Sequence, residues 1–221
     1  MTISRNETAR LSRRALTLVP DRDCPLCPRL VAFREANRAR EPLWHNAPVA
    51  PFGDTKARLL IVGLAPGMQG ANRTGRPFTG DYAGDLLYAT LIEYGFAKGS
   101  YQARPDDGLR LVDCRIANAV HCVPPQNKPL PAEINTCRQF LVANLATMPN
   151  LRAIVALGRI AHDSVLKPLN LKASQAPLRP WRGASGRRVQ ALRQLSLLAL
   201  QHEHPRADAG HVPKCVREGE G

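Results

Sequence analysis

The 221-residue sequence has no apolar run that approaches the roughly 18 residues needed to cross a bilayer, so we expect no membrane span and no membrane partner. Its first residues, MTISRNETARLSRR, also lack the apolar segment of a secretory signal. Without export, a disulfide framework is not expected among the six cysteines, because such frameworks persist in oxidising compartments. We therefore expect a cytoplasmic protein whose cysteines remain available for metal, cluster or redox roles.

Acidic residues are also scarce: 18 Asp and Glu stand against 31 Lys and Arg, which gives a formal charge of +13. A field of that sign attracts polyanions, and nucleic acid is the leading candidate partner. The alternative is a basic protein that is merely soluble. With 44% apolar and 22% charged residues, the composition is that of a folded domain rather than a disordered chain.

Short apolar runs alternate with amphipathic stretches along the chain. This alternation predicts one α/β domain with a mostly parallel sheet and no internal repeat. In residues 24–40 a cysteine-containing loop leads into a helix whose arginines we expect to face solvent. The predicted strands cover residues 58–64, 112–120 and 151–157, and the further predicted helices cover 82–95, 132–148 and 159–168.

A glycine-rich loop, APGMQGANRTGRPFTGD, leaves the carboxyl end of the first predicted strand. Ligands of open α/β sheets bind at such ends. Glycines allow the backbone to approach a flat ligand, and the ring of Phe78 is able to stack on it. From the residue types alone, Phe78 fits equally well in the core, Asp81 fits a helix N-cap, and Asn118 fits a cap at the end of a strand.

Four cysteines have the spacing of a metal or cluster site, namely Cys24, Cys27, Cys122 and Cys137. Zinc ions and iron–sulfur clusters both need about four soft ligands in a tetrahedral array. The alternative is that all four are buried apolar thiols. Of the other two cysteines, we expect Cys114 to lie in the core and Cys215 to be free.

Four segments together resemble the uracil-DNA glycosylase superfamily, and most closely its iron–sulfur-containing type 5 branch. They are CPLCPRLVAFRE, LLIVGLAPGMQGANRTGRPFTGD, IANAVHCVPPQNKPLPAEINTC and ALGRIAHDSVL, and they span about residues 20–176 in the family's order. The resemblance implies a three-layer α/β/α sandwich around a four-stranded, mostly parallel sheet. It also implies a monomeric DNA repair enzyme that removes uracil from double-stranded DNA, with related deaminated bases such as hypoxanthine as further candidate substrates.

The same resemblance implies roles for individual residues. A structural 4Fe–4S cluster, with zinc as the alternative, would bind the four cysteines named above. Phe78 would stack on the extruded base, and the Asn118 amide would bind its edge. Asp81 would stabilise the oxocarbenium-like transition state and orient water. The backbone of Gly63, Leu64 and Ala65 would line the pocket.

The family's last loop, which reads like SYHxSxYNTxT and supplies a histidine beside the base, is absent from this chain. A one-base shift in codons chosen for LRPWRG and LRQLSLLALQHEH yields Phe-Ala-His-Gly-Ala and Phe-Asp-Ser-Tyr-His-Cys-Ser-Arg-Tyr-Asn-Thr-Asn, which resemble two family segments. We therefore expect a basic tail over 1–19, an incomplete glycosylase domain over 20–177 and a frameshifted tail over 178–221.

This interpretation predicts that the last strand is lost, that residues 192–200 form a helix if they are ordered, and that the activity is impaired. The tail histidines His202, His204 and His211 are then expected to be solvated. The competing function is a noncatalytic basic domain that binds nucleic acid and carries a structural metal or cluster.

Overall fold

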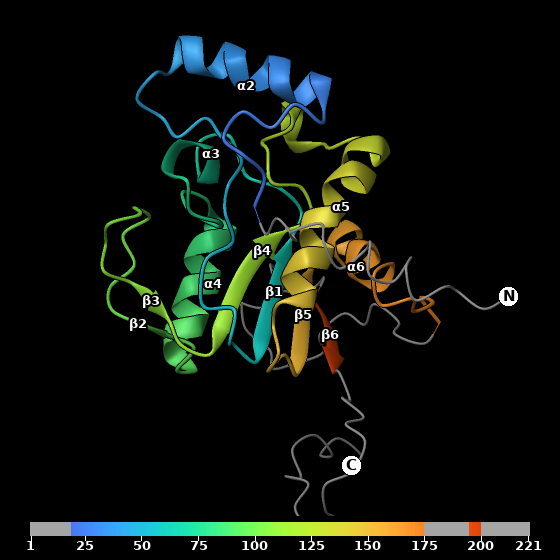
Figure 1. Ribbon diagram of the computed structural model, residues 1–221. Coiled ribbons are helices and arrows are strands. Elements are labelled where there is room, and N and C mark those ends of the chain that lie inside the picture. Colours follow the sequence, from blue (N-terminus) through green and yellow to red (C-terminus); the bar gives the residue numbers. More distant parts are fainter. Residues whose placement is uncertain (1–18, 175–194, 200–221) are drawn as a thin grey trace, which may run out of the picture.

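A central sheet of four strands organises the computed structural model, which describes residues 19–174 and 195–199 (Figure 1). Three strands are parallel, with β1 (Leu59–Gly63) between β4 (Cys114–Asn118) and β5 (Ala153–Leu157). The expected α/β class with a mostly parallel sheet is therefore confirmed.

The register of β1 and β4 fixes the position of the candidate site. Gly63 pairs with Asn118, so the last residues of two neighbouring strands lie side by side. The glycine-rich loop starts directly after Gly63, and the loop that carries Cys122 starts directly after Asn118. Two of the segments singled out in the sequence thus leave the sheet at the same end, where β1 and β4 finish.

Helices cover both faces of the sheet and complete the three layers (Figure 1). On one face lies α4 (Tyr82–Glu93), and on the other lie α5 (Pro131–Ala146) and α6 (Arg159–Leu166). None of the helices in the described ranges is both long and apolar enough to cross a bilayer. The remaining elements are α2 (Pro28–Arg40), α3 (Ala71–Thr74), the 3-10 helix η1 (Pro125–Asn127) and the hairpin strands β2 (Ala97–Lys98) and β3 (Arg110–Leu111).

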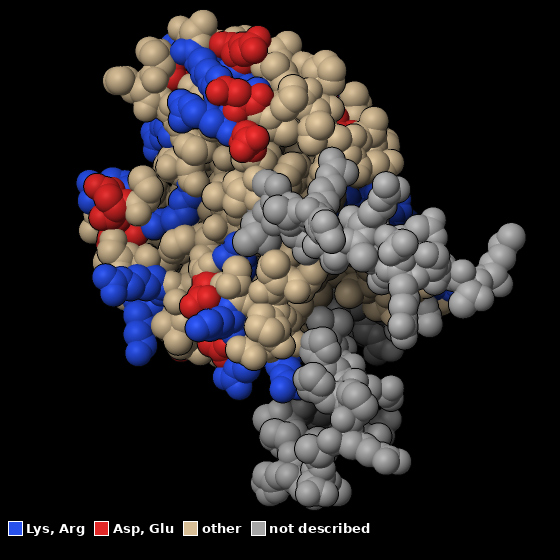
Figure 2. Space-filling model, in the orientation of Figure 1, with Lys and Arg blue, Asp and Glu red and all other residues tan. Residues whose placement is uncertain are grey.

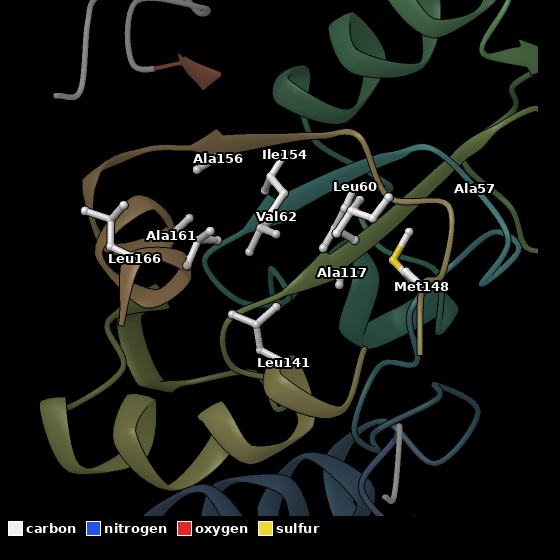
Figure 3. Close-up of a cluster of buried hydrophobic side chains, with 12 residues drawn as sticks. Ala57, Leu60, Val62, Ala117, Leu141, Met148, Ile154, Ala156, Ala161 and Leu166 are labelled. Carbon is white, nitrogen blue, oxygen red and sulfur yellow. The ribbon is translucent and has the colours of Figure 1, made fainter. Parts of the chain in front are cut away.

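Alternating side chains of β1 pack into two separate hydrophobic cores, because successive residues of a strand point to opposite faces. Leu60 and Val62 pack with Leu141 of α5 and the α6 residues in the cluster shown in Figure 3. Ile61 points to the other face and packs with residues of α4 and with Cys114, which is buried as expected. The sheet is therefore buried on both faces, which explains the continuous apolar run of β1.

The expectation that the last strand is lost is wrong. Residues Leu195–Ala199 form β6, which pairs antiparallel with β5 from Ala153↔Ala199 to Leu157↔Leu195. The leucine spacing that favoured a helix here also fits a strand, because a five-residue apolar run does not discriminate between the two. The free edge of β5 offers unpaired backbone groups, and pairing with them decides the outcome. The fourth strand runs antiparallel to its neighbour, so the sheet has four strands and is mostly parallel.

Candidate active site

Gly63 lies at the centre of the candidate site. A Cβ atom at this position would lie 2.5 Å from Asn118 Oδ1 and 2.5 Å from Phe78 Cζ. Only glycine therefore lets the Phe78 ring and the Asn118 amide approach the end of β1 together. This contact joins three of the residues that the sequence singled out.

A pocket of about 40 Å³ opens beside this contact. This volume holds several water molecules, whereas a pyrimidine base needs more, so a bound base has to widen the pocket. The structure brings Ala65, Phe78, Asp81 and Asn118 together around it, as expected. Leu64 is not among the lining side chains; its carbonyl accepts a hydrogen bond from the Val120 backbone N–H (2.9 Å). The other lining residues are Gly67, Ala71 and Thr79.

The side chain of Asn118 is buried, with 3% of its surface exposed, and its Oδ1 has no hydrogen-bond partner among the described residues. A buried polar atom without a partner costs about 1–3 kcal/mol, so most buried polar atoms have one. The Asn118 side chain lines the pocket, so its Oδ1 is an acceptor that a donor inside the pocket can reach.

Phe78 has a backbone φ of 55°, in the left-handed region that non-glycine residues seldom adopt. Two tyrosine hydroxyls hold the segment in this conformation: Tyr88 donates to the Pro77 carbonyl (2.7 Å) and Tyr101 donates to the Phe78 carbonyl (3.2 Å). Burial raises the pKa of Tyr101 to about 12, so its hydroxyl keeps the proton that it donates. Strained conformations of this kind persist where the surroundings fix them, commonly at functional sites.

A buried ion pair between Arg76 and Asp107 packs against the rings of the two tyrosines. The Arg76 guanidinium donates to both carboxylate oxygens of Asp107, at 2.7 and 2.6 Å. It also lies over the rings of Tyr88 and Tyr101, at 5.2 and 5.5 Å from their centroids. The sequence analysis missed this network, because Asp107 follows Arg76 by 31 residues and carries no local motif.

Asp81 is a helix N-cap and also lines the pocket. It is the N-cap of α4, where its Oδ1 accepts a hydrogen bond from the Gly84 backbone N–H (2.7 Å). The residue is exposed and lines the pocket, and its Oδ2 faces Gly67 across the loop. One carboxylate oxygen is therefore used by the helix, while the other is available to water or substrate.

The four cysteines of the expected cluster lie near one another. Cys27 packs against Cys122 and Cys137 in a small apolar cluster with Leu30 and Phe140. None of the four is in a disulfide. Burial raises the pKa of Cys122 to about 11 and that of Cys137 to about 12, and the neighbouring cysteine thiols add to both shifts.

The donor set fits a cluster or a zinc ion in type and number, because four free thiols gather around one apolar patch. Within residues 19–174 and 195–199, however, no three Cys, His, Asp or Glu side chains are already arranged as metal ligands. Polar contacts hold the surrounding backbone: Arg34 donates to the Cys24 carbonyl at 3.2 Å, and the His121 backbone N–H points at Cys137 Sγ (3.4 Å). Arg34 is buried rather than solvated, contrary to expectation, because it makes this contact.

Four residues named in the sequence analysis, Cys215, His202, His204 and His211, lie outside the described ranges. Their expected states stay predictions.

Comparisons with known proteins agree on one family. The family model described as the uracil DNA glycosylase superfamily matches residues 50–216. A type-5 uracil-DNA glycosylase of Thermus thermophilus is 47% identical over 162 residues, which are 71% of this chain and 73% of the relative. One of Mycobacterium bovis is 43% identical over 162 residues, 70% of this chain and 60% of the relative. A type-4 uracil-DNA glycosylase of Archaeoglobus fulgidus is 36% identical over 126 residues, 56% of this chain and 55% of the relative. The α/β fold, the pocket at the ends of β1 and β4 and these matches agree, and the chain belongs to the uracil-DNA glycosylase superfamily.

Proposed function

We propose that this protein hydrolyses the N-glycosidic bond of uracil in double-stranded DNA. The observation that carries the proposal is the orphan Oδ1 of Asn118, which lines the pocket. Uracil offers an N3–H donor to this acceptor, whereas cytosine presents a lone pair at the same ring position. The Asn118 oxygen therefore favours uracil, because a cytosine would leave two acceptors facing each other.

Phe78 and Asp81, which also line the pocket, supply stacking and charge. The Phe78 ring lies next to Gly63 and offers a flat face to a base that has left the DNA stack. Bond cleavage builds positive charge on the sugar, which the free oxygen of Asp81 stabilises while it orients the attacking water. The carboxylate is already fixed by its bond to Gly84 N–H, so little reorganisation is needed when the charge forms.

We further propose that Cys24, Cys27, Cys122 and Cys137 hold a 4Fe–4S cluster. When bound, the cluster is structural and links the segment before α2 to α5. The family membership and the four neighbouring thiols support it, and zinc is the alternative. Protein purified without oxygen is then expected to be brown and to contain iron, whereas colourless protein with stoichiometric zinc would contradict the cluster.

The sequence after about residue 177 remains a proposed frameshift. The family match extends to residue 216, so some family character persists beyond the proposed shift. The segment with the family's histidine is nevertheless absent, and we expect slower uracil release than from a frame-restored chain, defined as one with the base shift corrected. Sequencing of the source DNA tests this: an unbroken reading frame with no alternative downstream would refute it.

The test of the function uses both the 221-residue chain and the frame-restored chain. Each is incubated with uracil-containing duplex, and alkali then breaks the strand wherever a base has been removed. We expect cleavage at uracil by the restored chain and weaker cleavage by the 221-residue chain. If the folded restored chain binds the duplex in a salt-sensitive way without any cleavage, the noncatalytic binding domain is the better account.

A further inference from the structure

A second and larger hollow lies at the other end of α3 from the base pocket and has no role in the function proposed above. Its volume is about 550 Å³. Residues from four places in the chain line it: Arg22, the loop with Leu43, Trp44 and His45, the end of α3 and the 103–106 turn.

The hollow and the base pocket share the short helix α3. Ala71 at the start of α3 lines the base pocket, while Arg73 and Thr74 at its end line the hollow. The hydroxyls of Thr74 and Thr79 are 2.5 Å apart, and Thr79 belongs to the lining of the base pocket. The Thr74–Thr79 contact therefore links the lining of the hollow to the lining of the base pocket.

The wall of the hollow is rigidly joined to α3. The backbone N–H of His45 donates to the Arg73 carbonyl (3.0 Å), and that of Asn46 donates to the Asn72 carbonyl (3.1 Å). Gly75 has a φ of 80°, and a Cβ there would lie 2.9 Å from His45 Nδ1, so the turn brings its backbone against the histidine ring. A preformed wall of this kind loses little entropy when a ligand binds.

The charges of the lining favour an anion. Three arginines, Arg22, Arg73 and Arg104, face the hollow against one aspartate, Asp106. Asp106 lies 3.6 Å from Arg104 in an exposed pair, whereas the exposed side chains of Arg22 and Arg73 form no ion pair among the described residues. On the face drawn in Figure 2, Lys and Arg occur in several separate groups with Asp and Glu among them.

An aromatic and an aliphatic side chain accompany these arginines. Trp44 is half-buried, and Leu43 beside it is 97% exposed. Cationic side chains that alternate with flat apolar ones are typical of grooves that follow a nucleic-acid strand, because phosphates and bases then both find partners.

We propose that this hollow binds the DNA strand next to the extruded nucleotide. Arg73 and Arg104 contact its phosphates, and Trp44 packs against a neighbouring base or sugar. The inference rests on the proposed function, because it takes DNA as the polymer whose base occupies the pocket. It adds residues that contribute to affinity for DNA of any sequence.

The first test measures binding of the full chain to an undamaged duplex at several salt concentrations. Each phosphate contact contributes about 0.9 to the slope of log K against log salt. We expect Arg73→Gln and Arg104→Gln each to reduce the slope by about one. The control is Arg152→Gln, since Arg152 is exposed and lies directly before β5 at the opposite end of the sheet. Slopes of both hollow variants that equal the control slope would overturn the proposal.

A second readout locates the DNA directly. The sequence contains two tryptophans, so Trp181→Phe leaves Trp44 as the only one. Duplex DNA is expected to quench its fluorescence, with less quenching after Arg73→Gln at equal DNA concentration. Unchanged fluorescence at saturating DNA would contradict the contact.

The two proposals fail in different ways. If the hollow variants change the salt slope and the frame-restored chain releases no uracil, DNA binding in the hollow is supported and the glycosylase function is refuted. If uracil is released and the slopes do not move, the function stands and the hollow is not the strand-binding site.

Discussion

Two buried asparagines, Asn118 at the end of β4 and Asn144 on α5, use their side-chain amides differently. Asn144 of α5 is fully buried, and its Oδ1 accepts hydrogen bonds from Arg115 Nε (3.1 Å) and Nη2 (3.0 Å) on β4. Its Nδ2 donates to the Phe140 carbonyl (2.9 Å). Asn118 ends the same strand β4, is almost as buried, and leaves its Oδ1 without a partner among the described residues.

The difference separates a polar group that joins two elements of the fold from one that faces the pocket, which we propose binds the base. The Arg115–Asn144 contacts join β4 to α5, so the amide adds to the fold. The Asn118 oxygen makes no hydrogen bond to another described residue, so it is open to a donor inside the pocket. Buried polar groups with complete partners should therefore matter for stability, whereas those with incomplete partners should matter for activity.

The largest expected effect on the free energy of unfolding comes from the buried Arg76–Asp107 ion pair. Asp107→Asn removes one charge from a pair whose side chains are 4% and 0% exposed. Leaving a buried Arg76 without its counter-charge is expected to reduce the free energy of unfolding by about 3–5 kcal/mol. Urea denaturation measures it. The control is Asp163→Asn, in an exposed pair with Arg159 at 3.9 Å, where the loss should be about 0–1 kcal/mol.

The same pair predicts a pH dependence. The hydrogen bond from Arg76 holds the pKa of Asp107 well below its usual range. Because the folded-state pKa is the lower one, the stabilisation is complete above the unfolded pKa of about 3.9 and is lost as the pH falls through the folded value. The difference in unfolding free energy between the native chain and Asp107→Asn should therefore be constant near neutral pH and shrink only in strong acid. A difference that already shrinks near neutral pH would contradict the assignment.

The asparagine pair gives the next largest effect. Asn118→Ala is expected to lower uracil release by the frame-restored chain about 10²-fold, as for the loss of one aligned polar contact to a transition state. Its stability should change little, because no protein partner is lost. Asn144→Ala should instead lower the free energy of unfolding by about 1–3 kcal/mol, since it strips the Arg115 guanidinium of its acceptor. The reverse pattern would remove the distinction between the two residues.

Asp81→Asn sharpens the comparison at a residue that caps a helix and lines the pocket. Asparagine caps helices as well as aspartate does, so α4 should keep its stability. Loss of the charge is expected to reduce the single-turnover rate about 10²-fold with little change in DNA binding. A variant that keeps the full rate would reduce Asp81 to a helix cap.

The smallest expected effect belongs to Phe78. Phe78→Ala removes the stacking ring and should weaken binding of an extruded base by about 1–3 kcal/mol, seen as a higher KM. Phe78→Tyr is the matched control, because it keeps the ring. Equal KM values for the two variants would argue that the ring only fills the core.

The sequence predicted the parts of this site that depend on local pattern. The apolar runs of β1 and β4 were located to within two residues, and parallel pairing then brings Gly63 and Asn118 together. The sequence could not predict the contacts that hold the Phe78 segment. The Arg76–Asp107 pair among them depends on how the hairpin after α4 folds back. The buried Arg34 was missed for a similar reason: its partner is a backbone carbonyl, which no residue pattern reveals.

The antiparallel strand β6 shows a different limit. A short leucine-rich run fits a helix or a strand, and only the free edge of β5 distinguishes them. Local pattern therefore located the segment but predicted neither its type nor its direction.

The central claim is that Asn118 recognises a base that enters and widens the pocket at the ends of β1 and β4. The most direct measurement is a titration of free uracil into the 221-residue protein labelled with ¹⁵N at asparagine, with the Asn118 and Asn144 side-chain amides assigned by alanine substitution. We expect the Asn118 signal to shift with uracil, and the Asn144 signal to stay in place. Equal shifts of both signals, or none at Asn118 when uracil is in large excess, would contradict this account.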